Sequence, residues 1–293
     1  MKRFEFIHEE KADFPVHVLC SVLQVSRSGY YCWAERGPSE RTRRDEELTT
    51  KIRAIHSEHK HRYGSPRIHA ELASGGDTVS RKRVARLMRQ NGLKARPRKR
   101  FKRTTDSGHK HPIAPNLLKQ DFTADTPNQV WVGDITYLWT LEGWAYLAVL
   151  IDLYSRRVVG WALRKSLNRE LAIAALNQAV LRRRPESGLI HHTDRGCQYA
   201  SGDYQALLEH CGFVCSMSEA GRCWDNAVAE SFFGTLKKEL VHGCLFVTRT
   251  EAYDVISDYI ENYYNPKRRH SANGFVSPNQ FELLTHCDQL MAA

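Results

Sequence analysis

The 293-residue sequence lacks paired cysteines, an apolar N-terminal segment and any long hydrophobic run. Its eight cysteines are irregularly spaced, so we expect reduced thiols and no structural zinc site. The longest apolar run, residues 144–151, is too short to span a bilayer. Residues 1–10 carry charges where a signal peptide is apolar. These absences predict a folded protein of the cytoplasm.

Charge of one sign is in excess, and it is unevenly distributed. Residues 1–119 contain 27 Lys and Arg against 13 Asp and Glu, whereas residues 120–293 contain 16 against 20. A polyanion is therefore expected to bind the first part, with an affinity that falls as salt rises. Composition alone leaves the alternative open, a soluble basic protein without such a partner.

The first ninety residues have the spacing of amphipathic helices. Apolar residues recur with a helical period over 14–25 and 43–58. Ser26 and Ser65 precede further short helical patterns and are placed to act as N-caps. We therefore predict an all-helical N-terminal region.

The last two of these predicted helices resemble a helix-turn-helix. The Gly-Gly-Asp run at 75–77 ends one helix, and Ser80 is placed to cap the next, which runs to Asn91. One side of this second helix is apolar and the rest is basic, as in a helix that enters the major groove. The alternative is an ordinary amphipathic pair with a solvated basic face. The predicted DNA contacts on this helix are Arg81, Lys82, Arg83, Arg86 and Arg89.

A basic segment with few apolar residues follows the helices. Seven of the ten residues 94–103 are Lys or Arg. Such a stretch cannot bury enough apolar surface to pack, so we predict a linker over 94–124 that follows the phosphates of DNA. Its predicted DNA contacts are Arg98, Lys99 and Arg100.

From about residue 125 the sequence is typical of an α/β fold. Three runs rich in branched and aromatic residues predict a meander of strands, and alternating helices and strands follow. We therefore expect a mixed sheet flanked by helices. The predicted strands cover 130–138, 144–153, 157–163, 189–193 and 213–217, and the predicted helices cover 168–184, 201–211, 225–241 and 250–264.

Three acidic residues stand in short runs suited to binding a divalent cation beside a phosphate. Asp134 lies in Val-Gly-Asp-Ile-Thr-Tyr within the first predicted strand. Asp194 lies in His-His-Thr-Asp-Arg-Gly-Cys-Gln-Tyr at the carboxyl end of the fourth, where α/β sheets place their ligands. Glu230 lies on the helix that Asp225 is predicted to cap. We expect the three side chains to converge.

The residues around these acids indicate that the acids have a functional role and are not chance occurrences. An Asp inside an apolar strand is costly unless it is paired or binds a metal, which applies to Asp134. Glu230 and Lys237 are nearly two helical turns apart, and Asn226 precedes the glutamate by one turn, so the three share a face. Asp152 also borders a strand, but the turn that follows it explains its presence.

Three converging carboxylates suit two Mg²⁺ ions, with Mn²⁺ as an alternative. Each Mg²⁺ is held by one or two carboxylates and by substrate phosphate. Two ions about 3.5–4 Å apart activate the nucleophile and stabilise the leaving oxygen of an in-line displacement. Water or a DNA 3′-hydroxyl is the nucleophile in such a reaction. The pattern therefore predicts cutting and joining of nucleic acid.

The motifs resemble those of a known family. The runs around Asp134, Asp194 and Glu230 are similar to the catalytic core of the retroviral-integrase superfamily, and most of all to bacterial insertion-sequence transposases encoded by a second open reading frame. Val-Ser-Arg-Ser-Gly-Tyr-Tyr, Tyr-Gly-Ser-Pro-Arg-Ile and the C-terminal Tyr-Asn-Pro-Lys-Arg-Arg-His-Ser share this resemblance, which spans nearly the whole chain.

The resemblance implies a ribonuclease-H-like core in which Asp134, Asp194 and Glu230 are the catalytic metal triad. Lys237 matches the basic residue that the family places two turns after its glutamate, which implies contact with DNA near the element end. Asn226, on the same face, is a further predicted DNA contact. The chain lacks the His and Cys zinc module of retroviral integrases, which favours the bacterial branch.

The resemblance also implies partners. These are the terminal inverted repeats of an element, target DNA and further copies of the chain on DNA. Family members often work as a fusion with the product of an upstream frame, which adds that product as a partner. The expected location is the bacterial cytoplasm, on the nucleoid when the protein is bound to DNA.

We therefore expect a DNA transposase in three parts. A helical DNA-binding region covers 1–93, the basic linker 94–124, and an integrase-like catalytic core with a C-terminal helix 125–293. The enzyme would cleave at the ends of an insertion sequence and transfer the 3′-hydroxyl into target DNA. Two alternatives are a hydrolytic nuclease of the same fold and a helix-turn-helix regulator whose second half only dimerises or senses a ligand. Which N-terminal helix reads bases is not specified by the sequence.

Overall fold

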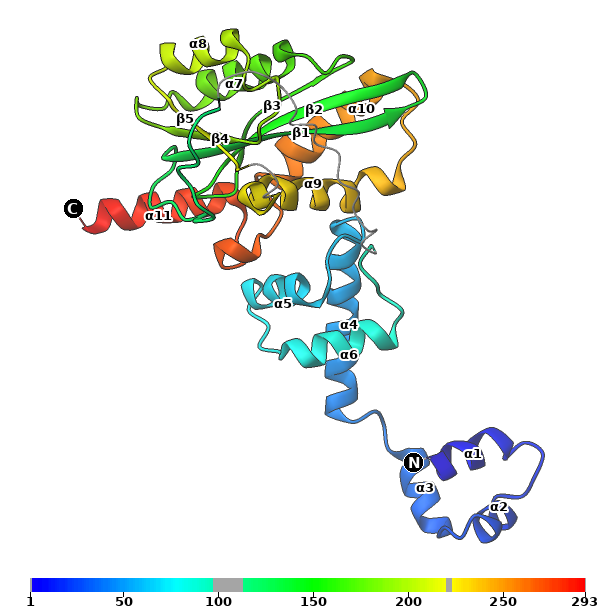
Figure 1. Ribbon diagram of the computed structural model, residues 1–293. Coiled ribbons are helices and arrows are strands. Elements are labelled where there is room, and N and C mark those ends of the chain that lie inside the picture. Colours follow the sequence, from blue (N-terminus) through cyan, green and yellow to red (C-terminus); the bar gives the residue numbers. More distant parts are fainter. Residues whose placement is uncertain (1, 97–112, 220–222, 293) are drawn as a thin grey trace. The chain divides into compact units, whose positions relative to one another are not determined.

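The computed structural model describes residues 2–96, 113–219 and 223–292 (Figure 1). The chain divides into two compact units, residues 1–95 and 96–293. None of the helices in the described ranges combines the length and the hydrophobicity that a membrane crossing requires.

The first unit begins with three short helices. They are α1 (Lys2–Glu10), α2 (Val16–Val22) and α3 (Arg27–Glu35). The Ser26 hydroxyl accepts a hydrogen bond from the Gly29 backbone N–H at 3.0 Å, which confirms the predicted cap of α3. The sequence did not predict α1, because five of its nine residues are charged. The three helices enclose a small core of Ile7, Leu19, Cys20 and Tyr30.

Three further helices complete this unit. They are α4 (Glu40–Glu58), α5 (Ser65–Ser74) and α6 (Arg81–Gln90), so the predicted all-helical region is confirmed. The apolar stripe predicted for α6 is buried. The buried apolar residues of the three helices are Leu48, Ile52, Ile68, Leu72, Val84, Leu87 and Met88.

Of the starts of α5 and α6, one follows the prediction and the other differs. The Ser80 hydroxyl accepts a hydrogen bond from the Arg83 backbone N–H at 3.2 Å and caps α6, as predicted. The predicted cap at Ser65 is wrong. Gly64 occupies the N-cap position, and Ser65 already lies inside α5, because the proline ring of Pro66 suits the first helical turn.

The second unit is built on a five-stranded mixed sheet with the strand order β3-β2-β1-β4-β5. β1 pairs antiparallel with β2, which pairs antiparallel with β3, whereas β4 runs parallel to both β1 and β5. The predicted meander and mixed α/β fold are therefore confirmed. In chain order the strands cover Val130–Thr140, Gly143–Asp152, Val158–Arg164, Ile190–Thr193 and Val214–Met217.

Helices cover both faces of this sheet (Figure 1). α7 (Arg169–Arg183) and α8 (Gly202–His210) pack on one face, and α9 (Ala227–Glu239) and α10 (Arg249–Ser257) pack on the other. The predicted helix at 250–264 is continuous but changes from α- to π-helical geometry at Asp258. The chain then continues to a last helix, α11 (Pro278–Ala292).

Alternation along β1 decides which face each side chain occupies. Val130 and Val132 pack in the core that contains Phe232 of α9, whereas Trp131 packs in the opposite core with α7 and α8. Asp134 continues the even-numbered series and therefore lies on the face that α9 covers. The register of one strand thus brings the first predicted acid toward the helix that carries the third.

The start of α9 differs from the prediction. Asp225 lies in a short 3₁₀ turn, and its carboxylate accepts hydrogen bonds from the Glu219 backbone N–H at 2.9 Å and from the Asn116 side chain at 3.0 Å. The predicted cap at Asp225 is therefore wrong, because that carboxylate binds the preceding loops instead. Asn226 occupies the N-cap position of α9.

Candidate active site

Asp134 lies within β1, opposite Val149 of β2. Its side chain is partly buried, and Oδ1 accepts a hydrogen bond from the Ile135 backbone N–H at 2.7 Å. Burial raises the pKa of the Asp134 carboxyl well above its usual range, and the negative charges of Asp194 and Glu230 raise it further. The charges of the other two predicted acids therefore both act on Asp134.

Asp194 follows directly after β4, in a loop that hydrogen bonds hold in place. Its Oδ1 accepts a hydrogen bond from the Gly196 backbone N–H at 2.9 Å. The Arg195 guanidinium donates to the backbone carbonyl of Ser218 at 2.6 Å, which joins this loop to the segment after β5. The carboxylate is therefore presented at the carboxyl ends of two parallel strands, as predicted.

His192 of β4 connects the strand that precedes this loop to β5 and to the segment after β5. It is fully buried, and its two ring nitrogens lie 2.8 Å from the Ser216 hydroxyl and 3.2 Å from the Ser218 hydroxyl. Burial lowers the pKa of this imidazole to about 4, so it is neutral at ordinary pH. A neutral ring can donate at one nitrogen and accept at the other, which suits a bridge between two hydroxyls.

Glu230 is partly buried in the first turn of α9. The start of this helix is attached to β1 by Asn226, whose side-chain amide donates to the Gly133 carbonyl at 3.1 Å. Gly133 immediately precedes Asp134, so this bond brings the first turn of α9 next to the aspartate. Asn226 is itself buried, which does not favour the DNA contact that the sequence suggested for it.

Lys237 lies on α9 two turns beyond Glu230, at a partly buried position. Burial lowers the pKa of its ammonium group, and the negative charge of Asp134 raises it. In return, the Lys237 charge lowers the pKa of the Asp134 carboxyl. A cation therefore stands beside the acidic group, as the spacing along the helix predicted.

The three carboxylates come from three separate segments of the chain, and the charges of Asp194 and Glu230 both act on Asp134. Within the part of the chain that the structure describes, no three His, Cys, Asp or Glu side chains form a group close enough to hold a metal ion. The acids are thus electrostatic neighbours without the geometry of a closed metal cluster. Hard carboxylate oxygens are nevertheless the donor type that Mg²⁺ prefers.

The basic residues predicted to bind DNA on α6 fall into two groups. Arg83 and Arg86 donate to the two carboxylate oxygens of Asp45 on α4, each at 2.7 Å. Their charge is therefore partly offset within the protein. The exposed members of the set are Arg81, Lys82 and Arg89. The linker residues Arg98, Lys99 and Arg100 lie outside the described residues.

A buried ion pair that sequence reasoning missed supports the far end of α9. The Arg268 guanidinium forms hydrogen bonds of 2.7 to 3.0 Å with both carboxylate oxygens of Glu239, and the Tyr259 hydroxyl donates to the same carboxylate at 2.9 Å. Arg268 and Glu239 are each almost fully buried. The signal was available, because Arg268 belongs to the C-terminal motif that carries the family resemblance.

Asp152 has the structural role that its sequence neighbourhood predicted. It is completely buried at the end of β2. Its carboxylate accepts hydrogen bonds from the backbone N–H groups of Asn128 at 2.7 Å and Tyr154 at 2.9 Å. Arg183 lies 3.7 Å away. The Tyr154 bond belongs to the turn between β2 and β3, and the Asn128 bond attaches that turn to the residues that precede β1.

Three family models match the sequence. The model described as an integrase core domain matches residues 124–223, and a second integrase core domain model matches residues 230–285. An HTH-like domain model matches residues 43–101. The matches therefore cover the regions that contain all three acids and α4 to α6.

Two similar proteins come from Shigella sonnei and Escherichia coli. The insertion element IS600 uncharacterized 31 kDa protein of Shigella sonnei is 46% identical over 268 residues, which cover 92% of this chain and 98% of that protein. Transposase InsF for insertion sequence IS3A of Escherichia coli K12 is 44% identical over 282 residues, covering 96% and 98%. Among solved structures, the HTLV-2 integrase catalytic core domain in complex with magnesium is 20% identical, with a TM-score of 0.41, and the match covers 54% of this chain and 97% of that one.

Proposed function

The chain belongs to the insertion-sequence transposases of the IS3 type, and from this premise we propose that Asp134, Asp194 and Glu230 are its catalytic, metal-binding residues. Its activity is DNA transposition, performed by an integrase-type core that acts as a DDE-type polynucleotidyl transferase. The observation that carries the residue assignment is that Asp134 lies on the face of the sheet that α9 covers, next to the first turn of that helix, where the negative charges of Asp194 and Glu230 both act on its carboxyl.

Divalent cations fit this group of acids. Burial and two neighbouring negative charges all raise the pKa of Asp134, so a bound cation would relieve an unfavourable concentration of negative charge. The proposed ligands are the carboxylates of Asp134, Asp194 and Glu230, for two Mg²⁺ ions that Mn²⁺ can replace. When bound, such ions polarise a phosphodiester and lower the pKa of an attacking hydroxyl.

The chain's own residues hold the acids and the substrate in register. The Asn226 amide keeps the first turn of α9 against β1, and the Gly196 N–H orients the Asp194 carboxylate. We assign Asn226 a positioning role. Lys237 supplies a positive charge for a DNA phosphate next to the scissile bond.

The reaction that follows has two steps at one site. Water attacks a phosphodiester at the element end and leaves a free 3′-hydroxyl. That hydroxyl then attacks a phosphodiester of target DNA, which joins the two strands and releases a target 3′-hydroxyl. Both steps displace an oxygen from phosphorus in line, so the same three acids serve both.

The two units divide this work between them. We propose that residues 1–93 bind DNA, that Arg98, Lys99 and Arg100 belong to a basic linker, and that 125–293 form the catalytic core. The linker predicted over 94–124 is wrong for its last part, because Leu118 is buried in the core that contains Val130, and Phe122 packs against that core. The terminal inverted repeats and target DNA are the proposed substrates. Further copies of the chain, and the product of an upstream frame, are the proposed protein partners. The proposed location is the cytoplasm, on the nucleoid when the protein is bound to DNA.

The first prediction tests the acid assignment. Asp134→Asn keeps the size of the side chain but removes a charged ligand, so we expect strand joining to fall by at least about a hundredfold. The assay incubates a duplex that ends in the element's terminal repeat with a target duplex, in Mg²⁺ and in Mn²⁺, and separates cut from joined products on a gel.

Asp254→Asn, which changes an exposed acid on α10, is the matched control and should retain full activity. The unfolding temperatures of both variants establish that the fold is intact. Undiminished joining by Asp134→Asn would refute the assignment. Cut products without joined products from the unaltered chain would favour a hydrolytic nuclease instead.

A further inference from the structure

α2 and α3 form a helix-turn-helix of their own, outside the HTH-like match at residues 43–101. Residues 23–26 connect the two helices. Gln24 has a φ of 52°, the left-handed conformation for which such turns commonly use glycine. Buried side chains from both helices hold the pair in a fixed arrangement with α1. They are Leu19 and Cys20 from α2, Tyr30 from α3 and Ile7 from α1.

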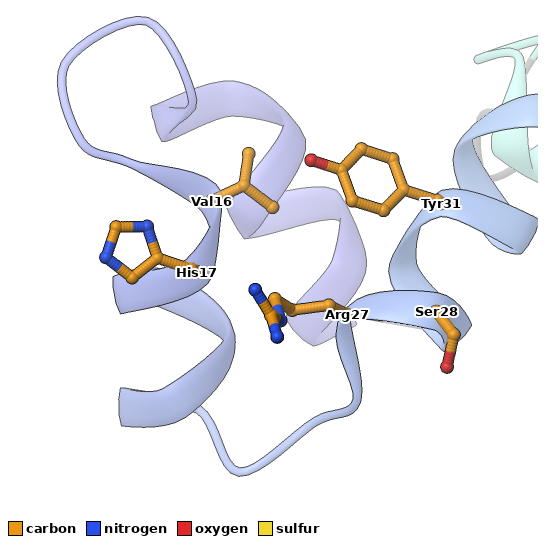
Figure 2. A pocket seen from close by; sticks show the side chains of 5 residues that line it. All are labelled: Val16, His17, Arg27, Ser28 and Tyr31. Atoms are coloured by element: carbon orange, nitrogen blue, oxygen red, sulfur yellow. The ribbon is translucent and has the colours of Figure 1, made fainter.

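The outer side of this helix pair is hollowed and polar (Figure 2). Val16 and His17 of α2 line the hollow together with Arg27, Ser28 and Tyr31 of α3. Figure 2 shows the Arg27 side chain extending from the first turn of α3 toward α2. His17, Arg27, Ser28 and Tyr31 are all exposed, so the core of the unit does not require them.

The charge of this surface is of one sign. Residues 14–34 contain no Asp or Glu, and Arg27 is their only Lys or Arg. Arg27 forms no salt bridge with any residue that the structure describes. On α6, by contrast, Arg83 and Arg86 are both bound to Asp45. The Arg27 guanidinium is thus better placed than those of Arg83 and Arg86 to bind an external acceptor.

The side chains in the hollow match the edges of base pairs. An Arg fork pairs with the O6 and N7 acceptors of guanine in the major groove, and hydroxyl groups such as those of Ser28 and Tyr31 both donate and accept. In a helix-turn-helix, it is the first turns of the second helix that reach the bases, while the first helix crosses the backbone. Arg27, Ser28 and Tyr31 occupy those turns, and His17 lies on the first helix.

We propose that α3 is a recognition helix that enters the major groove of the element's terminal DNA and reads it through Arg27, Ser28 and Tyr31, while His17 contacts the adjacent backbone. This inference rests on the proposed function and deepens it, because it assigns base reading to a part of the chain outside the HTH-like match. The exposed apolar residues Val18 and Val22 on α2 favour a protein contact as the competing explanation.

The test measures DNA binding without cleavage. The full-length chain carries Asp134→Asn and is kept in EDTA, so that affinity is separated from chemistry. Two duplexes are compared, one ending in the element's terminal repeat and one with the same bases in scrambled order. Arg27→Ala is expected to weaken binding to the terminal duplex about tenfold or more, and to weaken binding to the scrambled duplex much less.

Two further variants sharpen the result. Arg27→Lys keeps the charge but loses the planar fork, so it should bind both duplexes and lose most of the preference for the terminal one. Lys11→Ala removes an exposed cation of the same unit that belongs to neither α2 nor α3, and should change neither affinity by more than about twofold. Methylation of guanine N7 at one or two positions should interfere with binding by the parent chain and not with binding by Arg27→Ala.

The outcomes separate this inference from the proposed function. Full preference for the terminal duplex in Arg27→Ala overturns the role of α3. Strand joining by Arg27→Ala with Asp134 intact, lost when Asp134→Asn is added, would still support the triad. A change in self-association on sedimentation, with unchanged DNA preference, also overturns it and marks the surface as a protein contact. Absence of any terminal preference in the parent chain overturns it as well.

Discussion

The ammonium group of Lys237 and the carboxyl group of Asp134 each shift the pKa of the other. Burial lowers the pKa of Lys237, and the aspartate opposes that effect. A positive charge at this place offsets part of the repulsion among the acids. It also lies where a phosphate must come if those acids bind the cations that act on it. Lys237 is therefore expected to contribute to DNA affinity through charge more than through shape.

We predict that Lys237→Ala weakens binding to every duplex and lowers the slope of log affinity against log salt by about one. Lys237→Arg should preserve that slope, because it preserves the charge. Fluorescence anisotropy titrations between about 50 and 200 mM salt measure the slope. An unchanged slope in Lys237→Ala would place the ammonium group away from the DNA backbone.

The buried imidazole of His191 makes the free energy of unfolding depend on pH. It is enclosed on β4, with Nε2 2.7 Å from the Tyr204 hydroxyl, and burial lowers the pKa of its imidazole to about 3. A histidine in the unfolded chain has a pKa of about 6.5. Below that pH the unfolded state binds the proton first, so the free energy of unfolding falls by about 1.4 kcal/mol per pH unit as pH drops toward 3.

We predict that His191→Gln, which can still bond to the Tyr204 hydroxyl, makes the loss of stability between about pH 6 and pH 4.5 less steep. Urea unfolding at a series of pH values measures this slope. His210→Gln, at an exposed site, is the control and should leave the slope unchanged. If His191→Gln follows the parent chain over this range, the buried imidazole is not the group that titrates.

α9 carries Glu230 and Lys237, and it is attached at both ends. At its start the Asn226 amide bonds to the β1 backbone, and at its end Glu239 forms a buried ion pair with Arg268. The pair fixes the direction of the helix across the sheet, and so the position of Glu230 relative to Asp134. Breaking a buried pair by removing one partner leaves an uncompensated charge in a dry site.

We predict that Arg268→Ala lowers the free energy of unfolding of the second unit by about 3–5 kcal/mol, because Glu239 is then buried without its partner. The double variant Arg268→Met with Glu239→Gln should recover a large part of this loss. Arg169→Ala, which breaks an exposed pair with Asp203, should cost less than about 1 kcal/mol. Chemical denaturation provides the measurement, and equal losses in the buried and exposed pairs would contradict it.

Over the whole chain, charge and acid chemistry are divided between two regions. The surplus of Lys and Arg lies in residues 1–119, and the three acids lie in the unit that has a mixed sheet. A basic region concentrates the chain on DNA and leaves the catalytic unit free to carry the negative groups that metal binding needs. The division therefore separates general DNA affinity from chemistry.

We predict that replacing the three exposed cations of α6, Arg81, Lys82 and Arg89, by alanine lowers the salt slope of DNA binding by up to about three. Replacing Arg83 and Arg86, which Asp45 already binds, should lower it by less. Binding of the full chain to scrambled duplex over a range of salt concentrations provides both numbers. Equal effects of the two variants would show that pairing with Asp45 does not withhold charge from DNA.

Much of this architecture is predictable from particular residues. The apolar period of Val84, Leu87 and Met88 predicts the buried stripe of α6, and branched runs predict each strand of the meander. Some predicted N-caps formed and others did not, because other hydrogen-bond partners compete with the helix start for the side chain. Ser26 and Ser80 have no better partner than the helix start, whereas Asp225 finds donors in two loops that the local sequence does not reveal.

In the candidate site, too, some residues could be predicted from the sequence and others could not. Asp134, Asp194 and Glu230 stand out from the sequence because of the residues around each of them, and the spacing from Glu230 to Lys237 follows from helix geometry. The buried partners do not stand out. Arg268 lies 29 residues from Glu239 along the chain, and the two meet only because α9 and the C-terminal segment pack together.

The order of residues by itself determined the periods of helix and strand, the surplus of positive charge and the identity of the acidic side chains, since each of these is local along the chain. Only the tertiary structure decided that even-numbered positions of β1 face α9, that Asn226 is buried against the sheet, and that Asp45 binds two arginines of α6 while Arg27 keeps an exposed guanidinium. The physical reason is that burial and pairing depend on which distant segments pack together, and packing is a property of the whole folded chain.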